Sequence, residues 1–119
     1  RRVGLSAPSV ADRVRRLEDL GVITGYGARI DPARLGYGLT ILIRARPSPG
    51  EMGNMIEAIR ETPQIVACDR VSGEDCFVAR AHVRDVAEME AVIDRSVPFG
   101  ATNSSIVQST PVEERLVEL

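Results

Sequence analysis

Near the start of the chain, apolar residues recur with the period of a helix. Val10, Val14 and Leu17 follow the spacing i, i+4, i+7, and polar side chains occupy the opposite side. Ser6 precedes this pattern as an N-cap candidate, and Gly21 follows it as a stop signal. We therefore predict a helix of about four turns with a buried apolar stripe.

The helix is followed by residues 22–30, which combine β-branched residues with glycines and lead into Asp31-Pro32. This composition predicts a short strand that acts as a hinge. We accordingly divide the chain into a helical module (1–21), a hinge strand and linker (22–34), and a larger domain (35–119).

From residue 35 onwards the apolar pattern changes repeatedly between a period of two and a helical period. The period of two predicts strands at 39–46, 65–71, 77–84 and 104–110. Helical spacing predicts one helix that begins at Met52 and ends before Pro63, and another over 86–97. Residues 72–75 form a turn between the second and third strands. The stripe expected on the second helix consists of Val86, Met89, Ile93 and Val97.

The resulting order, β-α-β-β-α-β, predicts an α+β fold of the ferredoxin-like type. Two crossovers that share a central hairpin give a four-stranded antiparallel sheet with both helices on one face. The other face should carry Leu42, Val66, Cys68 and Val78, which is too apolar to leave in water. A second copy of the chain would bury this face most simply, so the strand pattern predicts an oligomer.

Composition argues against several classes of function. The hydrophobic share of 44% is that of a globular protein, and the lack of Trp with only 3% aromatic residues disfavours single-stranded nucleic acid as a partner. No stretch is long and apolar enough to span a membrane, and no signal peptide is visible, so we expect a cytoplasmic protein without a membrane partner. No nucleophile-base pair, carboxylate pair or phosphate loop is present, which disfavours an enzyme and leaves no catalytic residues to name.

The two cysteines and the single histidine indicate neither a metal site nor a cofactor. Cys68 and Cys76 form no CxxC pair, and we expect inert buried thiols, with a redox switch as the alternative. His82 lies on the outer side of its strand beside Arg80 and Arg84, as a surface or interface residue.

Charge is distributed unevenly along the chain. Residues 1–34 contain seven arginines against four acidic residues, whereas residues 35–119 contain eight arginines against thirteen. A basic module on an acidic domain suggests that only the front of the chain meets a polyanion, although a solvated charged face would give the same pattern.

Motifs in residues 4–37 resemble those of the Lrp/AsnC, or feast/famine, family of transcription regulators. The matching elements are Gly4-Leu5-Ser6, Val10, Arg13 to Glu18, Gly21-Val22-Ile23, Gly25-Tyr26, Ala28, Asp31-Pro32 and Leu35-Gly36-Tyr37. The resemblance implies that residues 1–21 are the C-terminal part of a winged helix-turn-helix domain and that the helix described above is its recognition helix. The helices that precede it in that domain are not in this sequence, so we expect this piece alone to bind DNA poorly.

A recognition helix needs small polar residues near base edges and arginines that reach phosphates or guanine. The residues that meet this demand are Ser6, Ala7, Ser9, Arg13 and Arg16. Without the resemblance, a solvated amphipathic helix would be the simpler interpretation.

For a small-molecule effector, the resemblance implies a glycine-containing turn between the second and third strands, together with a polar entry to the fourth. The residues at these places are Gly73, Glu74, Asp75, Thr102, Asn103 and Ser104. Backbone and hydroxyl donors here suit the carboxylate of an amino acid. Cys76 stands where the family usually has Asp, and this difference removes a fixed anionic partner for the amino group of the ligand. The alternative interpretation of residues 72–75 is a plain surface turn.

The leading hypothesis is therefore a regulator that binds double-stranded DNA and responds to an amino acid or related metabolite. The resemblance implies a homodimer that assembles into higher oligomers, with the effector bound between dimers. The alternative is a ligand-binding and oligomerisation module without DNA function in this form.

Overall fold

The computed structural model describes residues 7–74 and 76–118, and it divides the chain into two compact units. The N-terminal unit comprises residues 1–30 and the C-terminal unit residues 31–119. Each unit is described by itself below.

The N-terminal unit is built around the helix α1 (Ala7–Asp19), and the predicted stop signal, Gly21, follows its end. Gly21 has φ 76°, a conformation that favours glycine, and its N–H donates to the Glu18 carbonyl at 3.0 Å. The N–H of Val22 donates to the Leu17 carbonyl at 2.8 Å. These two bonds form a Schellman motif that satisfies the last free carbonyls of the helix. The predicted cap residue Ser6 lies outside the described residues.

Two expectations for this unit were wrong. The apolar stripe of α1 is not buried, because Val10 and Val14 are 48% and 38% exposed and no other part of residues 7–30 packs over them. Residues 23–31 form no strand, since an extended segment needs a strand beside it to bond with and no described residue supplies one. The segment is held to the helix by the Tyr26 hydroxyl, which donates to the Glu18 carboxylate at 3.0 Å.

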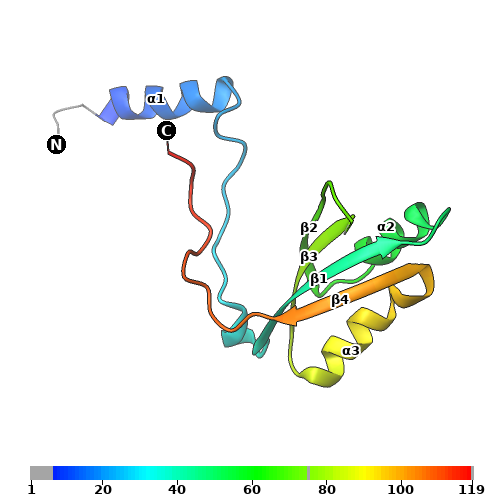
Figure 1. The fold of residues 1–119 in the computed structure, drawn as a ribbon. Coiled ribbons are helices and arrows are strands. Elements are labelled where there is room, and N and C mark those ends of the chain that lie inside the picture. Colours follow the sequence, from blue (N-terminus) through cyan, green and yellow to red (C-terminus); the bar gives the residue numbers. More distant parts are fainter. Residues whose placement is uncertain (1–6, 75, 119) are drawn as a thin grey trace. The chain divides into compact units, whose positions relative to one another are not determined.

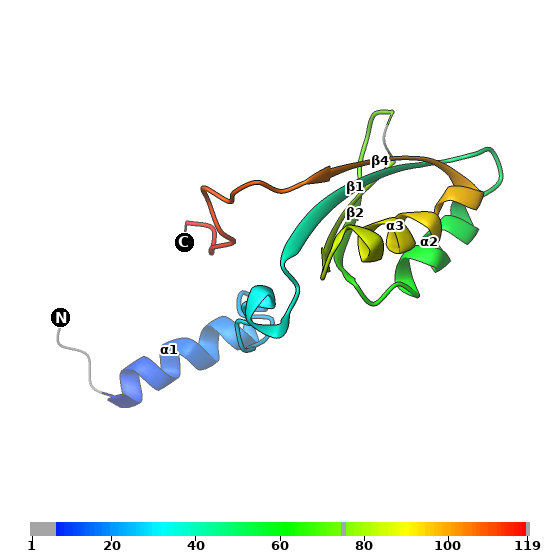
Figure 2. The same ribbon diagram turned by 90° about the horizontal axis from the view of Figure 1, so that it is seen from below.

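The C-terminal unit has the predicted order of elements (Figure 1). Its strands and helices are β1 (Leu39–Pro47), α2 (Met52–Arg60), β2 (Ile65–Arg70), β3 (Phe77–Val83), α3 (Val86–Asp94) and β4 (Gly100–Ile106). Short 3-10 helices, η1 (Pro32–Leu35) and η2 (Val97–Phe99), precede β1 and β4. The sheet is antiparallel throughout with the order β2-β3-β1-β4, and both helices cover the same face (Figure 2). The ferredoxin-like fold is confirmed.

The core lies between the sheet and the two helices. The alternating side chains of β1 and β3 that point to the helices are nearly inaccessible, as the period of two predicted. Around α3 the core cluster contains Ile41, Ile43, Ala79, Ala81, Val83 and Val92; around α2 it contains Ala45, Met55, Ile59 and Phe77.

The boundaries of two elements differ from the prediction. The last strand begins at Gly100 and ends at Ile106, about four residues earlier than expected, because residues 100–106 are the ones that pair with β1. The helix α3 ends at Asp94, and its one fully buried residue is Val92. Val86 and Val97, assigned to its stripe, are each about half exposed.

A β-bulge in the edge strand β2 corrects the predicted composition of the open sheet face. The register shifts between Ile65 and Ala67, so that Cys68 lies opposite the buried Ala79 and shares its helix-covered face. An extra residue reverses the alternation downstream of it. Ala67 and Asp69 therefore take the places on the open face that the unbroken alternation gave to Val66 and Cys68.

Candidate functional site

The α1 helix places three of the predicted DNA-contacting residues on one face. Ser9, Arg13 and Arg16 follow i, i+4, i+7, and all three are exposed. Within residues 7–30, Arg13 and Arg16 make no ion pair, so their charges remain available to an anion. Arg15 projects from another side and pairs with Asp12 at 2.9 Å.

Two further predicted contacts belong to the beginning of this helix. Ala7 is the first helical residue, so the free N–H groups of the first turn begin there. Ser6 lies outside the described residues. What the structure offers for DNA is therefore an exposed face with two unpaired guanidinium groups.

The predicted effector turn connects β2 to β3. Gly73 has φ 105°, and the Val71 N–H donates to the carbonyl of Cys76 at 2.8 Å, which closes the loop across its base. Glu74 is exposed at the tip, and Asp75 lies outside the described residues. Cys76 is half-buried and packs against the α2 part of the core.

The three predicted effector residues of β4 do not share a face. Thr102 and Ser104 lie opposite Ala45 and Ile43, on the side covered by the helices. Asn103 lies opposite Arg44 on the open side. Thr102 and Asn103 thus lie on opposite faces of the sheet.

Within one chain, the turn and these β4 residues stay apart. Phe77, Ala45 and Thr102 stand in one row across the sheet, so the turn that precedes Phe77 and the start of β4 lie at the same end. Two strands separate β2 from β4, and at the usual spacing between strands this amounts to about 14 Å.

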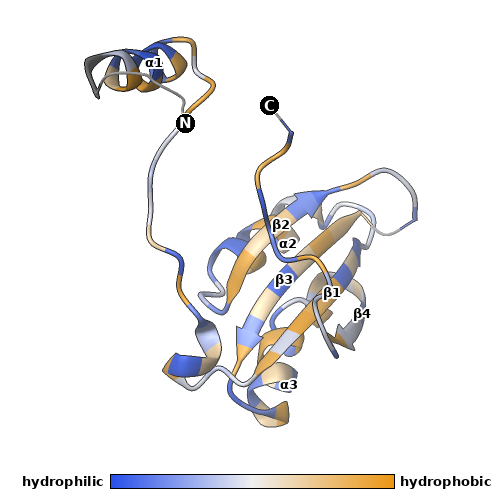
Figure 3. Cartoon of the chain, turned by 90° about the vertical axis from the view of Figure 1, so that its left-hand side faces the viewer, coloured by the Kyte–Doolittle hydropathy of each residue, from blue (hydrophilic) through white to orange (hydrophobic). Residues whose placement is uncertain are grey.

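The open face of the sheet combines an apolar centre with basic groups. Half-buried Leu42 and Val78 line a shallow cleft of about 200 Å³ together with Arg80, Ala67 and Asp69. Figure 3 looks at this face with α2 and α3 behind the sheet. The mixture is more polar than the sequence led us to expect, since the bulge replaces a thiol with a carboxylate.

His82 lies on the same face, as predicted, and bonds across to β1. Its Nδ1 is 2.9 Å from the hydroxyl oxygen of Thr40. Burial lowers the pKa of His82 below its usual 6.5, and the charge of Arg80 lowers it further. The ring is therefore neutral at physiological pH.

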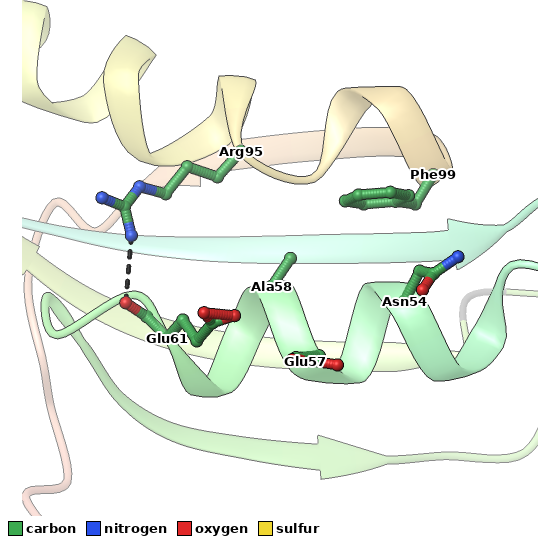
Figure 4. A pocket seen from close by; sticks show the side chains of 6 residues that line it. All are labelled: Asn54, Glu57, Ala58, Glu61, Arg95 and Phe99. Carbon is green, nitrogen blue, oxygen red and sulfur yellow. Dashed lines mark hydrogen bonds between the residues drawn. The ribbon is translucent and has the colours of Figure 1, made fainter.

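A cleft between the two helices was not anticipated from the sequence (Figure 4). It encloses about 550 Å³, and Arg95 spans it to donate a 3.0 Å hydrogen bond to the Glu61 carbonyl just after α2. Its lining consists of Asn54, Glu57, Ala58, Glu61, Arg95 and Phe99. The polar spacing 54, 57, 61 along α2 and its C-cap was a visible signal, but the partners just after α3 and in η2 depend on the packing. Because Arg95 is engaged with the end of α2, we interpret this cleft as part of the helix packing.

Among the described residues, no three metal-binding side chains gather, and no helix has the length and apolarity that a membrane span requires.

Comparison with known proteins extends these observations. The profile of the Lrp/AsnC ligand binding domain matches residues 40–117, and that of a winged helix-turn-helix DNA-binding domain matches residues 1–24. The transcriptional regulator LrpC of Bacillus subtilis is 28% identical, over 92% of this chain and 76% of its own length. The regulator LrpA of Mycobacterium tuberculosis is 31% identical, over 96% of this chain and 78% of its own.

Solved structures agree with this picture. The structure of B. subtilis LrpC superposes with a TM-score of 0.84 at 26% identity, covering 92% of this chain and 79% of that one. A feast or famine regulatory protein of M. tuberculosis, solved in complex with L-methionine, superposes with a TM-score of 0.82 at 30% identity, covering 96% and 80%.

Proposed function

The chain belongs to the Lrp/AsnC family of transcription regulators, and from that premise we propose that it binds double-stranded DNA and responds to an amino acid or a related metabolite. The observation that carries this proposal is the order of the two family matches, a DNA-binding profile followed by a ligand-binding profile along one chain. In this division residues 1–21 belong to the DNA-binding domain, 22–34 are hinge and linker, and 35–119 sense the effector and assemble. We place the protein in the cytoplasm, where such regulators act.

We propose that α1 is the recognition helix. Its N-terminal end, with Ser6, Ala7 and Ser9, enters the major groove, and Arg13 and Arg16 contact phosphates or guanine edges. The shared exposed face of Ser9, Arg13 and Arg16 supports this assignment. Since arginines that neutralise phosphates release counterions, binding should weaken steeply with salt.

For the effector, we propose a site shared by two copies. The turn residues Gly73, Glu74 and Asp75 come from one subunit, and Thr102, Asn103 and Ser104 come from another. The separation of about 14 Å between β2 and β4 within one chain supports the sharing. Backbone N–H groups of the turn and the hydroxyls of β4 donate hydrogen bonds to the ligand carboxylate, while Glu74 or Asp75 accepts a hydrogen bond from the ligand amino group.

We propose that two copies pair through the open sheet faces to form a homodimer, and that dimers associate further. Leu42 and Val78 supply the apolar centre of the interface. A ligand bound between dimers favours one assembly over another, which changes the spacing of the recognition helices along DNA. The mechanism is a shift of equilibrium and involves no bond chemistry.

The experiment that tests this proposal is the solution mass of the chain, measured by light scattering with and without free amino acids. L-methionine is tested first because a structural neighbour was solved with it. We expect a dimer or a multiple of dimers whose mass is shifted by one ligand. Asn103→Ala should abolish the shift, and Glu90→Gln on the exposed surface of α3 should preserve it. A monomer that no ligand affects would contradict the shared site.

The alternative function is a ligand-binding and oligomerisation module without DNA activity. The compact C-terminal unit favours it, because this unit has its own core and the ligand-binding profile matches nearly all of it. Fluorescence anisotropy with random-sequence duplex DNA at low salt separates the two. Weak binding that Arg13→Gln reduces and Arg15→Gln preserves supports the regulator, and binding that both variants reduce equally supports the module.

A further inference from the structure

A second cleft opens between α2 and the edge strand β2, on the helix-covered side of the sheet. It encloses about 300 Å³, near the lower end of the range for small-molecule sites. We refer to it as the α2–β2 cleft, and its lining consists of Ile56, Ile59, Arg60, Cys68, Arg70 and Phe77. The bulge in β2 is what brings Cys68 to this side.

The floor of the α2–β2 cleft is apolar. Ile59 and Phe77 belong to the core and are only 8% and 4% exposed, and half-buried Ile56 lies beside them. Their positions are fixed by the packing of α2 on the sheet, so the floor exists before any ligand arrives. A hydrocarbon group placed there would gain the free energy of leaving water.

The rim of the cleft is basic. Arg60 ends α2 and Arg70 ends β2, and both are exposed. Neither forms an ion pair with any residue in the described part of the chain. None of the six lining residues is acidic, so no lining side chain offers a negative charge to an ammonium group.

We propose that the α2–β2 cleft binds a small apolar carboxylate, such as a short-chain fatty acid or a 2-oxo acid with a hydrocarbon side chain. The hydrocarbon part lies on Ile56, Ile59 and Phe77, and Arg60 and Arg70 bind the carboxylate. Guanidinium groups match carboxylates in geometry as well as in charge. An amino acid fits less well, because its ammonium group would meet two cations.

This site is separate from the proposed amino-acid site and does not depend on it. The proposed effector site needs two copies of the chain, whereas all six residues of the α2–β2 cleft come from one. The two proposals can therefore fail independently.

Cys68 provides a direct readout, because its thiol lines the cleft and is exposed enough to react. Burial raises the pKa of this thiol, as does the neighbouring Asp69, so alkylation is measured at one mildly alkaline pH throughout. In the full chain, mass spectrometry after digestion follows Cys68 and Cys76 separately. The probes are hexanoate and hexylamine, which differ in the sign of the head group.

We expect hexanoate to slow the alkylation of Cys68 in a saturable way and to leave Cys76 unaffected, while hexylamine has little effect. Arg60→Gln or Arg70→Gln should each raise the apparent Kd for hexanoate about tenfold, the effect of losing one charge-assisted hydrogen bond. Arg34→Gln, a surface change in η1, is the matched control and should leave that Kd unchanged.

Three results would overturn the proposal. Absence of protection by hexanoate would show that the cleft does not bind an apolar acid, and equal protection by hexylamine would show that the arginines do not select the ligand. Equal losses in Arg34→Gln and Arg70→Gln would indicate non-specific attraction to a basic surface. Titration calorimetry with hexanoate on the unmodified chain gives the same decision without thiol chemistry.

Discussion

The guanidinium carbon of Arg84 lies 4.4 Å from the centroid of the Tyr37 ring, and the same group donates a hydrogen bond to the Tyr37 hydroxyl at 3.2 Å. The second terminal nitrogen of Arg84 forms an ion pair with Glu88 of α3 at 3.2 Å. Glu88 in turn accepts a hydrogen bond from the side chain of Gln64 at 3.4 Å. Tyr37 lies just before β1, where the chain enters the sheet. The stack therefore ties the entry point to the first turn of α3.

Replacing Tyr37 should loosen this entry point. Tyr37→Ala removes the cation-π contact and one hydrogen bond, and we expect it to lower the free energy of unfolding by about 1 kcal/mol in urea titrations. Tyr37→Phe keeps the ring and should cost less. Tyr26→Ala, in the N-terminal unit, is the control; an equal loss there would show that the stack contributes nothing of its own.

Two glycines should respond oppositely to alanine. A Cβ at Gly100 would collide with the carbonyl oxygen of Arg46 and lie 2.8 Å from the Cα of Pro47, in the backbone of the paired strand β1. We expect Gly100→Ala to destabilise by about 2 kcal/mol or more. Gly53 is helical with open space around it, so Gly53→Ala should stabilise by roughly 0.5 kcal/mol. Thermal unfolding compares the two, and a neutral Gly100→Ala would argue against the close approach of β1 and β4.

The exposed arginines of α1 should differ in their effect on DNA binding. If Arg13 and Arg16 contact phosphates, Arg13→Gln or Arg16→Gln should reduce the slope of log K against log salt by about one. Arg15→Gln, on another side of the same helix and paired with Asp12, should leave the slope unchanged. Anisotropy titrations at several salt concentrations measure these slopes, and a uniform effect of all three variants would count against a specific DNA face.

His82 should make stability depend on pH. Because burial and Arg80 lower its pKa in the folded chain, the unfolded chain binds this proton more readily. The contribution of His82 to the free energy of unfolding is therefore highest above pH 6.5, and it falls as the pH drops below that value. His82→Gln keeps a polar group beside Thr40 without the titration, so its stability should fall less over this interval. Urea titrations above and below 6.5 test this, and identical pH profiles would rule His82 out as a contributor.

The open sheet face can be tested for self-association at its centre. Leu42→Glu places a charge beside Val78, and if two copies pair through this face the variant should be monomeric by light scattering. Leu35→Glu, where the native side chain is 63% exposed, is the control and should keep the native mass. A Leu42→Glu variant with unchanged mass and unchanged circular dichroism would exclude this interface.

The sheet and its order could be predicted because β1 and β3 alternate without interruption. Each inward residue from Ile41 to Ala45 is apolar and each partner on β3 is too, so period and topology agree. Gly21 likewise predicted the end of α1, since the position after a helix C-terminus often needs a residue that tolerates positive φ.

The remaining errors have a common physical origin, because they depend on partners that local spacing does not specify. The residues of β4 are small and polar, and only their bonds to β1 set where the strand begins. The bulge that moves Cys68 to the other face lies between Ile65 and Ala67, where no glycine or proline in the sequence indicates it. The α2–β2 cleft unites residues from two strands and a helix, so no motif contains it.

The bulge in β2 also bears on how the sheet avoids growing sideways. A straight outer strand offers an unbroken row of backbone donors and acceptors to any passing strand, which is how ordered aggregates begin. The irregularity between Ile65 and Ala67 interrupts that row, and Asp69 and Arg70 add charge at the far end of the strand. Straightening the bulge by deleting Val66 should therefore make the protein prone to fibril formation as well as misplacing Cys68.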